Sequence, residues 1–290
     1  MKSNPEVETA IPDVGWYLYA VLPSSTEIPS MVGIDEGFPL VMIAEGDIGV
    51  MASPVSLTEF GTEALKRNLE DIRWVAEKAC RHEEIVEEIM RGLPLIPMRF
   101  GTIFLNLEKV KRMLRENFGR FQDALEYLSD KEEWGLKGFS DRQLLQEWVL
   151  KEDPELLRLS EEINTMSPGH AFFSKKRLLE KTSTIALEWE AELVRLIEEA
   201  IRGEAVDLVK NPTFPREATG VDEEMVINLA CLVLKEKVGA FIERVEDLNN
   251  NYRVKGLELQ ISGPWPPYNF SPRLDYNVTP DRPRADSVRS

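Results

Sequence analysis

Hydrophobic residues follow a two-residue or a continuous pattern in several short stretches, and these predict strands in the first half of the chain. Residues 15–23 (GWYLYAVLP) are aromatic and aliphatic and end at a proline, which is typical of a strand. Two short apolar runs on either side of Glu45, Gly46 and Asp47 predict a hairpin with glycine in its turn. Residues 93–104 (LPLIPMRFGTIF) return to strand character.

A helical period separates these strands. Residues 62–92 are predicted to form one helix, because apolar positions recur at steps of three and four and Gly92 suits a helix end. The residues of this stripe are Ile72, Val75, Ala79, His82, Val86 and Ile89. Two shorter helices are expected at about 106–117 and 119–130. We therefore predict an N-terminal α+β domain over residues 15–131.

A second set of patterns begins at residues 133–139 (EWGLKGF), which predict a strand. Asp141 can cap a helix that runs to about residue 159, Pro168 and Gly169 break the chain, and a long amphipathic helix is expected over about 172–202. Residues 205–214 contain a short strand, and the apolar run 224–234 reads as a strand buried on both faces. A helix with apolar positions from 238 to 248 and the alternating strand 257–262 follow.

This order is strand, helix, helix, strand, strand, helix, strand. It predicts a ferredoxin-like α+β domain over residues 132–270, so the fold class is α+β with two domains and long amphipathic helices. Residues 1–14 and 271–290 lack apolar periodicity and are predicted to be a disordered leader and a disordered tail. Neither a signal peptide nor a membrane-spanning stretch is recognisable, which predicts a cytoplasmic protein.

The charge balance narrows the classes of partner. The chain has 51 acidic and 35 basic residues and a formal net charge of -16, which disfavours non-specific binding to nucleic acid or to anionic membranes. Cys80 and Cys231 are far apart in sequence, so neither a disulfide framework nor a CxxC metal-binding motif can be recognised.

Candidate catalytic chemistry is sparse. His82 lies on the apolar stripe of its predicted helix, where a core histidine with local hydrogen bonds is the preferred interpretation; a role as a base would need Glu59 or Arg99 nearby. His170 lies at the break near Pro168, where capping or exposure is expected. The sequence has no HExxH, zinc-type cluster, GxSxG or phosphate-loop motif. We predict that the protein is not an enzyme and that it has no catalytic residue, no cofactor and no metal.

The octapeptide at residues 263–270 (GPWPPYNF) follows the last strand and cannot continue it, because its three prolines donate no ladder hydrogen bond. One interpretation is a proline-rich ligand for an SH3-type groove. The preferred one is a lid that folds over the sheet end of the second domain, with Trp265 packed beside Leu259 or Ile261.

Several segments appear in an order that resembles the gas vesicle protein F/L family. They are GWYLYAV, RWVAEKACRHEEIVEEI, LPLIPMRFGTIF, EWGLKGF, PGHAFFSKKRLLE and LELQISGPWPPYNF, and they span about residues 15–270. The resemblance implies two α+β domains and a non-enzymatic accessory protein of gas vesicle formation, located in the cytoplasm and at the gas vesicle. It assigns structural or partner-binding roles to Arg99, Phe100, Gly101, Gly263, Pro264, Trp265, Pro267 and Tyr268.

The resemblance also implies that the chain associates with the small hydrophobic shell protein of the vesicle, together with other accessory proteins. Three hypotheses follow. The first is an assembly chaperone or nucleation factor that binds the shell protein, the second is a minor structural component of the vesicle wall, and the third is an enzyme whose site carries no recognisable motif. The resemblance does not separate the F type from the L type.

Overall fold

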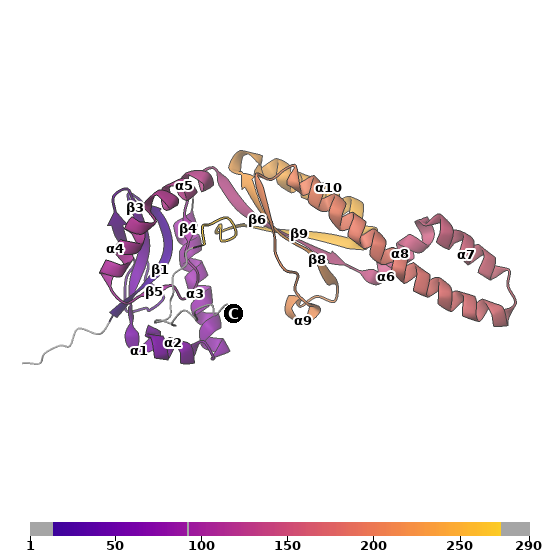
Figure 1. The fold of residues 1–290 in the computed structure, drawn as a ribbon, viewed down its shortest axis with the longest axis horizontal. Coiled ribbons are helices and arrows are strands. Elements are labelled where there is room, and N and C mark those ends of the chain that lie inside the picture. The colour runs from indigo at the N-terminus through magenta and orange to yellow at the C-terminus, as the bar shows by residue number, and fades with distance from the viewer. Residues whose placement is uncertain (1–13, 92, 274–290) are drawn as a thin grey trace, which may run out of the picture. The chain divides into compact units, whose positions relative to one another are not determined.

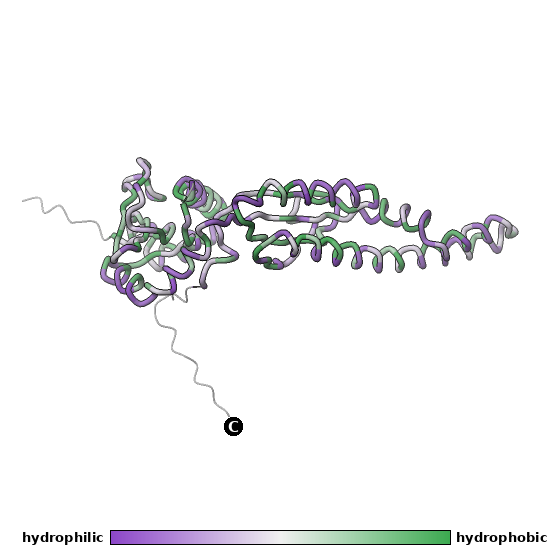
Figure 2. The backbone as a smooth tube through the Cα atoms, turned by 90° about the horizontal axis from the view of Figure 1, so that it is seen from above, coloured by the Kyte–Doolittle hydropathy of each residue, from purple (hydrophilic) through white to green (hydrophobic). Residues whose placement is uncertain are grey.

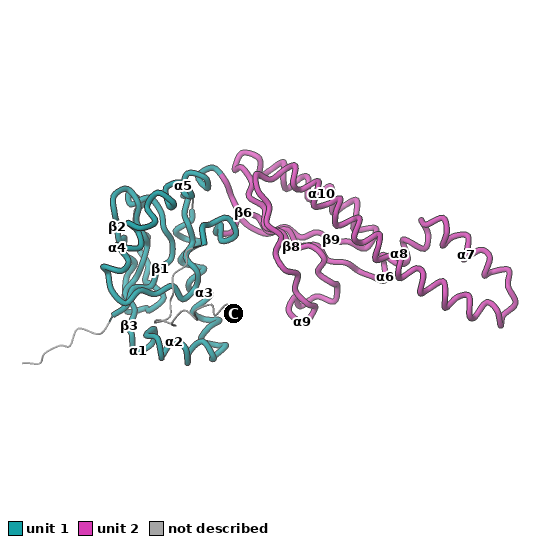
Figure 3. The backbone as a smooth tube through the Cα atoms, viewed as in Figure 1, with its two compact units in different colours: residues 1–130, 266–290 teal, residues 131–265 magenta. Residues whose placement is uncertain are grey.

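The structure is a computed structural model that describes residues 14–91 and 93–273 (Figure 1). The predicted disordered leader and tail therefore lie outside the described residues, apart from Val14 and residues 271–273. The chain forms two compact units, one of residues 1–130 and 266–290 and one of residues 131–265 (Figure 3). The first boundary is one residue from the expected one, but residues 266–270 group with the first unit and not with the second.

Unit 1 is a mixed unit of strands and helices. Its elements are β1 Val14–Pro23, β2 Val41–Glu45, β3 Ile48–Ser56, α1 Leu57–Phe60, α2 Thr62–Asn68, α3 Ile72–Met90, β4 Ile96–Pro97, β5 Ile103–Phe104, α4 Leu107–Glu116 and α5 Phe118–Leu128. The sheet has the order β2-β3-β1-β4, and β5 also pairs with β1. The β2–β3 hairpin is as predicted, with Gly46 in its turn at a φ of 66°, a conformation that glycine adopts without strain.

A register shift in β1 shapes the core of unit 1. The pairing of β1 with β3 shifts between Leu18 and Ala20, as in a β-bulge. Tyr17 before the shift, Tyr19 at the shift, and Ala20 and Leu22 after it therefore all belong to one buried cluster, which includes Ile85, Val86 and Ile89 of α3. Helices α4 and α5 contact strands β2, β3 and β4.

The predicted helix over residues 62–92 is wrong as a single element. It is divided into α2 and α3, because the Asp71 carboxylate accepts hydrogen bonds from the backbone N–H groups of Arg73 and Trp74 and so begins a new helix. Ile72, which we expected on the buried stripe, is 78% exposed for the same reason: it is the first residue of α3.

Unit 2 is also α+β. Its elements are β6 Lys131–Ser140, α6 Arg142–Glu152, α7 Pro154–Asn164, α8 Pro168–Arg202, β7 Asp207–Lys210, α9 Arg216–Thr219, β8 Glu224–Leu234, a 3₁₀ turn Lys235–Lys237, α10 Val238–Arg253 and β9 Leu257–Trp265. The sheet is antiparallel with the order β7-β8-β6-β9. Core residues of β6, β8 and β9 pack against α6, α8 and α10. The α+β class is confirmed, and the ferredoxin-like assignment stays a prediction.

Three details of unit 2 differ from expectation. The helix predicted from Asp141 to about residue 159 is two helices, since Asp153 caps α7 and Pro154 occupies its first turn. Pro168 does not break the long helix but begins it, for the same geometric reason. Strand β8 is buried on both faces only in its second half, because Val226 and Asn228 are half-buried.

Candidate functional site

The turn between β4 and β5 carries Arg99, Phe100 and Gly101, which form the first of two motifs. The second motif is the octapeptide at residues 263–270. Residues 93–104 are not one strand: β4 and β5 each pair with β1, and residues 98–102 form a turn between them. The carbonyl oxygen of Arg99 accepts hydrogen bonds from both the backbone N–H and the hydroxyl of Thr102, at 3.1 and 2.6 Å. Gly101 has a φ of 79°, which an L-residue with a side chain rarely adopts. These features fix the shape of the turn.

A buried histidine ties this turn to β1 and α3. The Tyr17 hydroxyl accepts the Gly101 N–H at 2.9 Å and lies 3.1 Å from Nδ1 of His82, and Nε2 of His82 lies 3.0 Å from the Met98 carbonyl oxygen. Because a carbonyl oxygen only accepts, Nε2 carries the proton and Nδ1 accepts from Tyr17. His82 is therefore a core histidine as predicted, but its partners are far away in sequence and not local.

The second motif reaches the same histidine. The Tyr268 hydroxyl lies 3.2 Å from Nε2 of His82 and donates a hydrogen bond of 3.0 Å to Oε1 of Glu83. Local bonds hold the segment in a compact turn, with the Tyr268 N–H donating to Pro266 and the Ser271 hydroxyl donating to Pro267. Residues 266–273 are thus anchored on α3, and the two motifs meet within unit 1.

The electrostatics of this network keep the His82 imidazole and the hydroxyl groups of Tyr17 and Tyr268 in their neutral forms near neutral pH. Burial lowers the pKa of His82 to about 4, and the bond to Met98 only partly opposes this. Burial raises the pKa of Tyr17 well above its usual value, and burial together with the Glu83 carboxylate does the same for Tyr268. Burial also raises the pKa of Glu83. A neutral imidazole that is fully buried serves here to connect α3, β1 and the two motifs.

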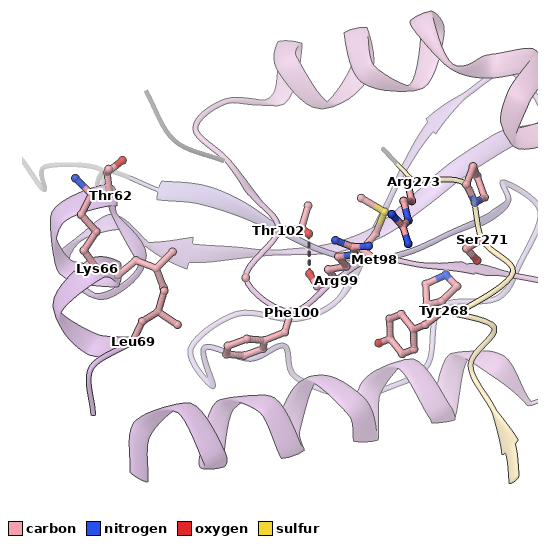
Figure 4. A pocket seen from close by; sticks show the side chains of 14 residues that line it. Thr62, Lys66, Leu69, Met98, Arg99, Phe100, Thr102, Tyr268, Ser271 and Arg273 are labelled. Carbon is pink, nitrogen blue, oxygen red and sulfur yellow. Dashed lines mark hydrogen bonds between the residues drawn. The ribbon is translucent and has the colours of Figure 1, made fainter. Parts of the chain in front are cut away.

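A pocket of about 450 Å³ lies beside this network (Figure 4). Helix α2 forms one side, the turn 97–102 forms the second, and the segment 268–273 forms the third. The side chains of Leu65, Leu69 and Phe100 are apolar, whereas Lys66, Arg99 and Arg273 are cationic. The arrangement suits a ligand that combines an apolar body with a negative charge.

Some of the motif residues come together here and others do not. Arg99, Phe100, Gly101 and Tyr268 line the pocket, and Pro267 is buried beside them in unit 1. Gly263, Pro264 and Trp265 lie at the end of β9 in unit 2.

The prediction that Trp265 is a buried lid is wrong. Its side chain is 43% exposed, and its indole N–H donates to the Ser262 hydroxyl at 3.0 Å. The strand continues through Pro264 to pair Trp265 with Glu133, so the residue lies at the last pair between β6 and β9 and beyond the core around Leu259. The octapeptide is divided between the units.

Among the described residues, no hydrogen bond or ion pair joins His82 to Glu59 or Arg99, the two partners considered for it. Glu59 instead accepts a hydrogen bond from the Trp74 indole at 2.8 Å and lies 3.7 Å from the Lys78 ammonium. The sequence does not indicate that Tyr17 is a partner of His82, because the two residues are 65 positions apart and no local pattern links them.

No group of three or more potential metal ligands occurs within residues 14–91 and 93–273. Over the same residues, none of the helices combines the length and the apolar character needed to cross a bilayer.

Comparison with known proteins gives a consistent result. The family described as "Gas vesicle synthesis protein GvpL/GvpF" matches residues 15–272. Gas vesicle protein F of Streptomyces sp. (strain CB03234) is 27% identical, with 88% of this chain and 98% of the relative covered. Gas vesicle protein L of the same organism is 26% identical, with 88% and 92% covered. The F and L relatives are thus almost equally similar to the chain.

Solved structures show the same fold at lower identity. The crystal structure of GvpF from Anabaena sp. PCC7120 aligns with a TM-score of 0.66 and 16% identity, covering 90% of this chain and 99% of that one. GvpF from Microcystis aeruginosa aligns with a TM-score of 0.60 and 20% identity, covering 88% and 98%. The family match extends over most of the chain and confirms the resemblance seen in the sequence: the protein belongs to the gas vesicle synthesis protein GvpL/GvpF family and has an accessory role in gas vesicles.

Proposed function

We propose that the chain binds the gas vesicle shell protein and covers its apolar surface, which prevents aggregation of the shell protein or helps it to nucleate a vesicle. A wall that encloses gas needs an apolar gas-facing surface, and such a surface aggregates in water before the wall is complete. A protein that binds it needs an apolar surface of its own. It also needs enough net charge to keep the complex in solution.

The observation that carries this proposal is an exposed apolar face on α8 and the turn before it. The side chains of Phe172 and Phe173 are 69% and 70% exposed, and Leu179, Leu187 and Met166 are also exposed. Phe172, Leu179 and Leu187 are separated by about two helical turns each, so they lie toward one side of the helix. We call Met166, Phe172, Phe173, Leu179 and Leu187 the α8 apolar face.

Aromatic residues make this face a stronger candidate than scattered exposed leucines. Phe172 and Phe173 contact each other edge to face, with ring centroids 5.6 Å apart. Large exposed aromatic side chains are typical of the central residues of protein interfaces. Hydrophilic residues recur between the hydrophobic ones along the helices of unit 2 (Figure 2), and the net charge of -16 opposes self-association of the chain.

The test is co-expression of the shell protein with the chain, followed by separation of soluble from pelleted material. We expect the wild-type chain to keep the shell protein soluble and the double variant Phe172→Ser, Phe173→Ser to lose this effect. The matched control is Ile72→Ser with Val254→Ser, which removes two apolar side chains that are 78% and 68% exposed elsewhere. If the shell protein pellets to the same extent with and without the wild-type chain, the proposal is wrong.

A second measurement distinguishes the proposed helper from a minor component of the vesicle wall. A helper that acts during assembly is lost when intact vesicles are purified and washed. A chain that remains at a constant ratio to the shell protein after washing would assign it to the wall.

A further inference from the structure

The pocket in unit 1 has a charge pattern that is unusual for so acidic a chain. Arg99 and Arg273 line it and are exposed, and no acidic side chain is among the described residues that line it. Neither arginine forms an ion pair with another residue in the described part of the chain, whereas Lys66 is paired with Glu63 at 2.9 Å. Within residues 14–91 and 93–273, two guanidinium groups at one pocket thus have no carboxylate partner (Figure 4).

Guanidinium groups select the chemistry of that ligand. Their planar donors match the two oxygens of a carboxylate, and a pair of them can hold one carboxylate from two directions. The apolar side chains of Leu65, Leu69 and Phe100 line the same pocket and favour an aliphatic or aromatic group next to the carboxylate.

The pocket is also held in shape before any ligand binds. The Met98 N–H donates to the Tyr19 carbonyl at 2.8 Å, and the Leu18 N–H donates to the Thr102 carbonyl at 2.9 Å, so both ends of the turn are bonded to β1. Tyr268 is held by Glu83 and His82. A site that is already ordered loses less entropy when a ligand binds.

The exposure of the arginines argues for a peptide and against a small free acid. A carboxylate bound by solvent-exposed cations contributes little binding free energy by itself. A peptide gains further contacts along the apolar side of the pocket and outside it, whereas a free acid that fits about 450 Å³ does not. We propose that this pocket binds a segment of a partner protein in which an acidic side chain is flanked by apolar residues.

This site is separate from the α8 apolar face proposed for the shell protein. It lies in unit 1, is cationic, and is built from the two sequence motifs. The double serine variant of α8 should therefore leave it intact, so the two proposals can fail independently.

The experiment uses the full chain and a phage-displayed library of random heptapeptides. Peptides are selected separately on three proteins: the wild type, the double variant Arg99→Gln, Arg273→Gln, and the control double variant Arg112→Gln, Arg120→Gln. The control removes two arginines that are exposed in the same unit and line no part of the pocket. Thermal unfolding of all three proteins checks that the substitutions leave the fold unchanged.

We expect the wild type and the control to enrich peptides with Asp or Glu beside apolar residues. A fluorescein-labelled peptide from this set should bind the Arg99→Gln, Arg273→Gln variant about threefold to fivefold more weakly than the wild type. The same peptide with its acidic residue replaced by Gln should lose affinity for the wild type to a similar extent. Failure to enrich acidic peptides, or equal binding by both double variants, would overturn the proposal.

Two competitors distinguish other occupants. If hexanoate displaces the labelled peptide at concentrations similar to those of the unlabelled peptide, the pocket binds small acids and the peptide proposal is wrong. Residues 274–290 follow Arg273 directly and contain Asp275, so a synthetic peptide of these residues is the second competitor. Displacement by this peptide would reassign the pocket to the chain's own C-terminal residues.

Discussion

The buried polar cluster of unit 1 and the α8 apolar face of unit 2 depart from the usual distribution of polar and apolar residues in opposite ways. In unit 1, His82 is fully buried, with Tyr17 beside it, and Tyr268 reaches it from the other end of the chain. In unit 2, Phe172 and Phe173 are among the most exposed hydrophobic residues described.

The difference lies in whether the residues have partners. Both ring nitrogens of His82 and the hydroxyl groups of Tyr17 and Tyr268 have hydrogen-bond partners, so the buried polar cluster is satisfied and stabilises unit 1. The two phenylalanines contact each other and remain largely open to water. A polar cluster with partners indicates a structural role, whereas an apolar cluster left exposed indicates binding. The following predictions test that contrast.

The largest effect is expected for Tyr17→Ala. Tyr17 is 1% exposed and packs against Tyr19, Phe60 and His82, so truncation should lower the free energy of unfolding by roughly 3–5 kcal/mol in denaturant titrations. Tyr17→Phe keeps the ring but leaves His82 Nδ1 and the Gly101 N–H without their partner, and should cost about 1–3 kcal/mol. If Tyr17→Phe is neutral, the hydroxyl does not hold the cluster together.

A pH effect of comparable size is expected from His82. Its pKa is about 4 in the folded chain and about 6.5 in the unfolded chain, so the unfolded chain binds the proton first as pH falls. Stability contributed by the neutral imidazole is present above pH 6.5 and is lost between about pH 6.5 and 4, by roughly 3 kcal/mol. The raised pKa of Glu83 acts in the opposite direction.

The measurement is the free energy of unfolding against pH for the wild type and His82→Gln. The difference between the two proteins should narrow as pH falls toward 4, because glutamine does not titrate. A difference that is constant over this range would mean that His82 is not buried in its neutral form.

The two aromatic residues of GPWPPYNF should behave differently, which sharpens the comparison within one short segment. Tyr268→Phe removes the bond to Glu83 and should lower the free energy of unfolding by about 1–2 kcal/mol. Trp265→Ala should cost about 1 kcal/mol or less, because the side chain is half-exposed at the sheet end. A loss of several kcal/mol for Trp265→Ala would restore the lid interpretation.

The smallest effect on stability is expected for the Phe172→Ser, Phe173→Ser variant. Both side chains face water, so the free energy of unfolding should change by no more than about 0.5 kcal/mol in thermal or denaturant unfolding. A large loss of stability would show that these residues complete a core. The contrast between the two units would then disappear, and so would the reason to assign the α8 apolar face to binding.

Much of the fold was readable from local sequence. The hairpin at Gly46, the strand of residues 15–23, the long amphipathic helices and the α+β class all depend on neighbours within a few residues, which is the range over which periodicity and turn chemistry act. The sequence also contains a local signal for the two places where a helix predicted from periodicity is in fact divided into two. Asp71 and the Asp153-Pro154 pair are typical helix starts, and each begins a helix within a stretch that we read as one.

The candidate site depended on contacts that no local signal specifies. Tyr268 and His82 are separated by 186 residues, and neither the helical stripe around His82 nor the prolines around Tyr268 indicates the other. The sequence alone identified the family, and it predicted a role for both motifs. The tertiary structure decided that one motif supplies the turn and the other the segment beside it, because packing chooses among distant partners only after the chain has folded back on itself. The same packing placed Trp265 and Tyr268, three residues apart, in different units.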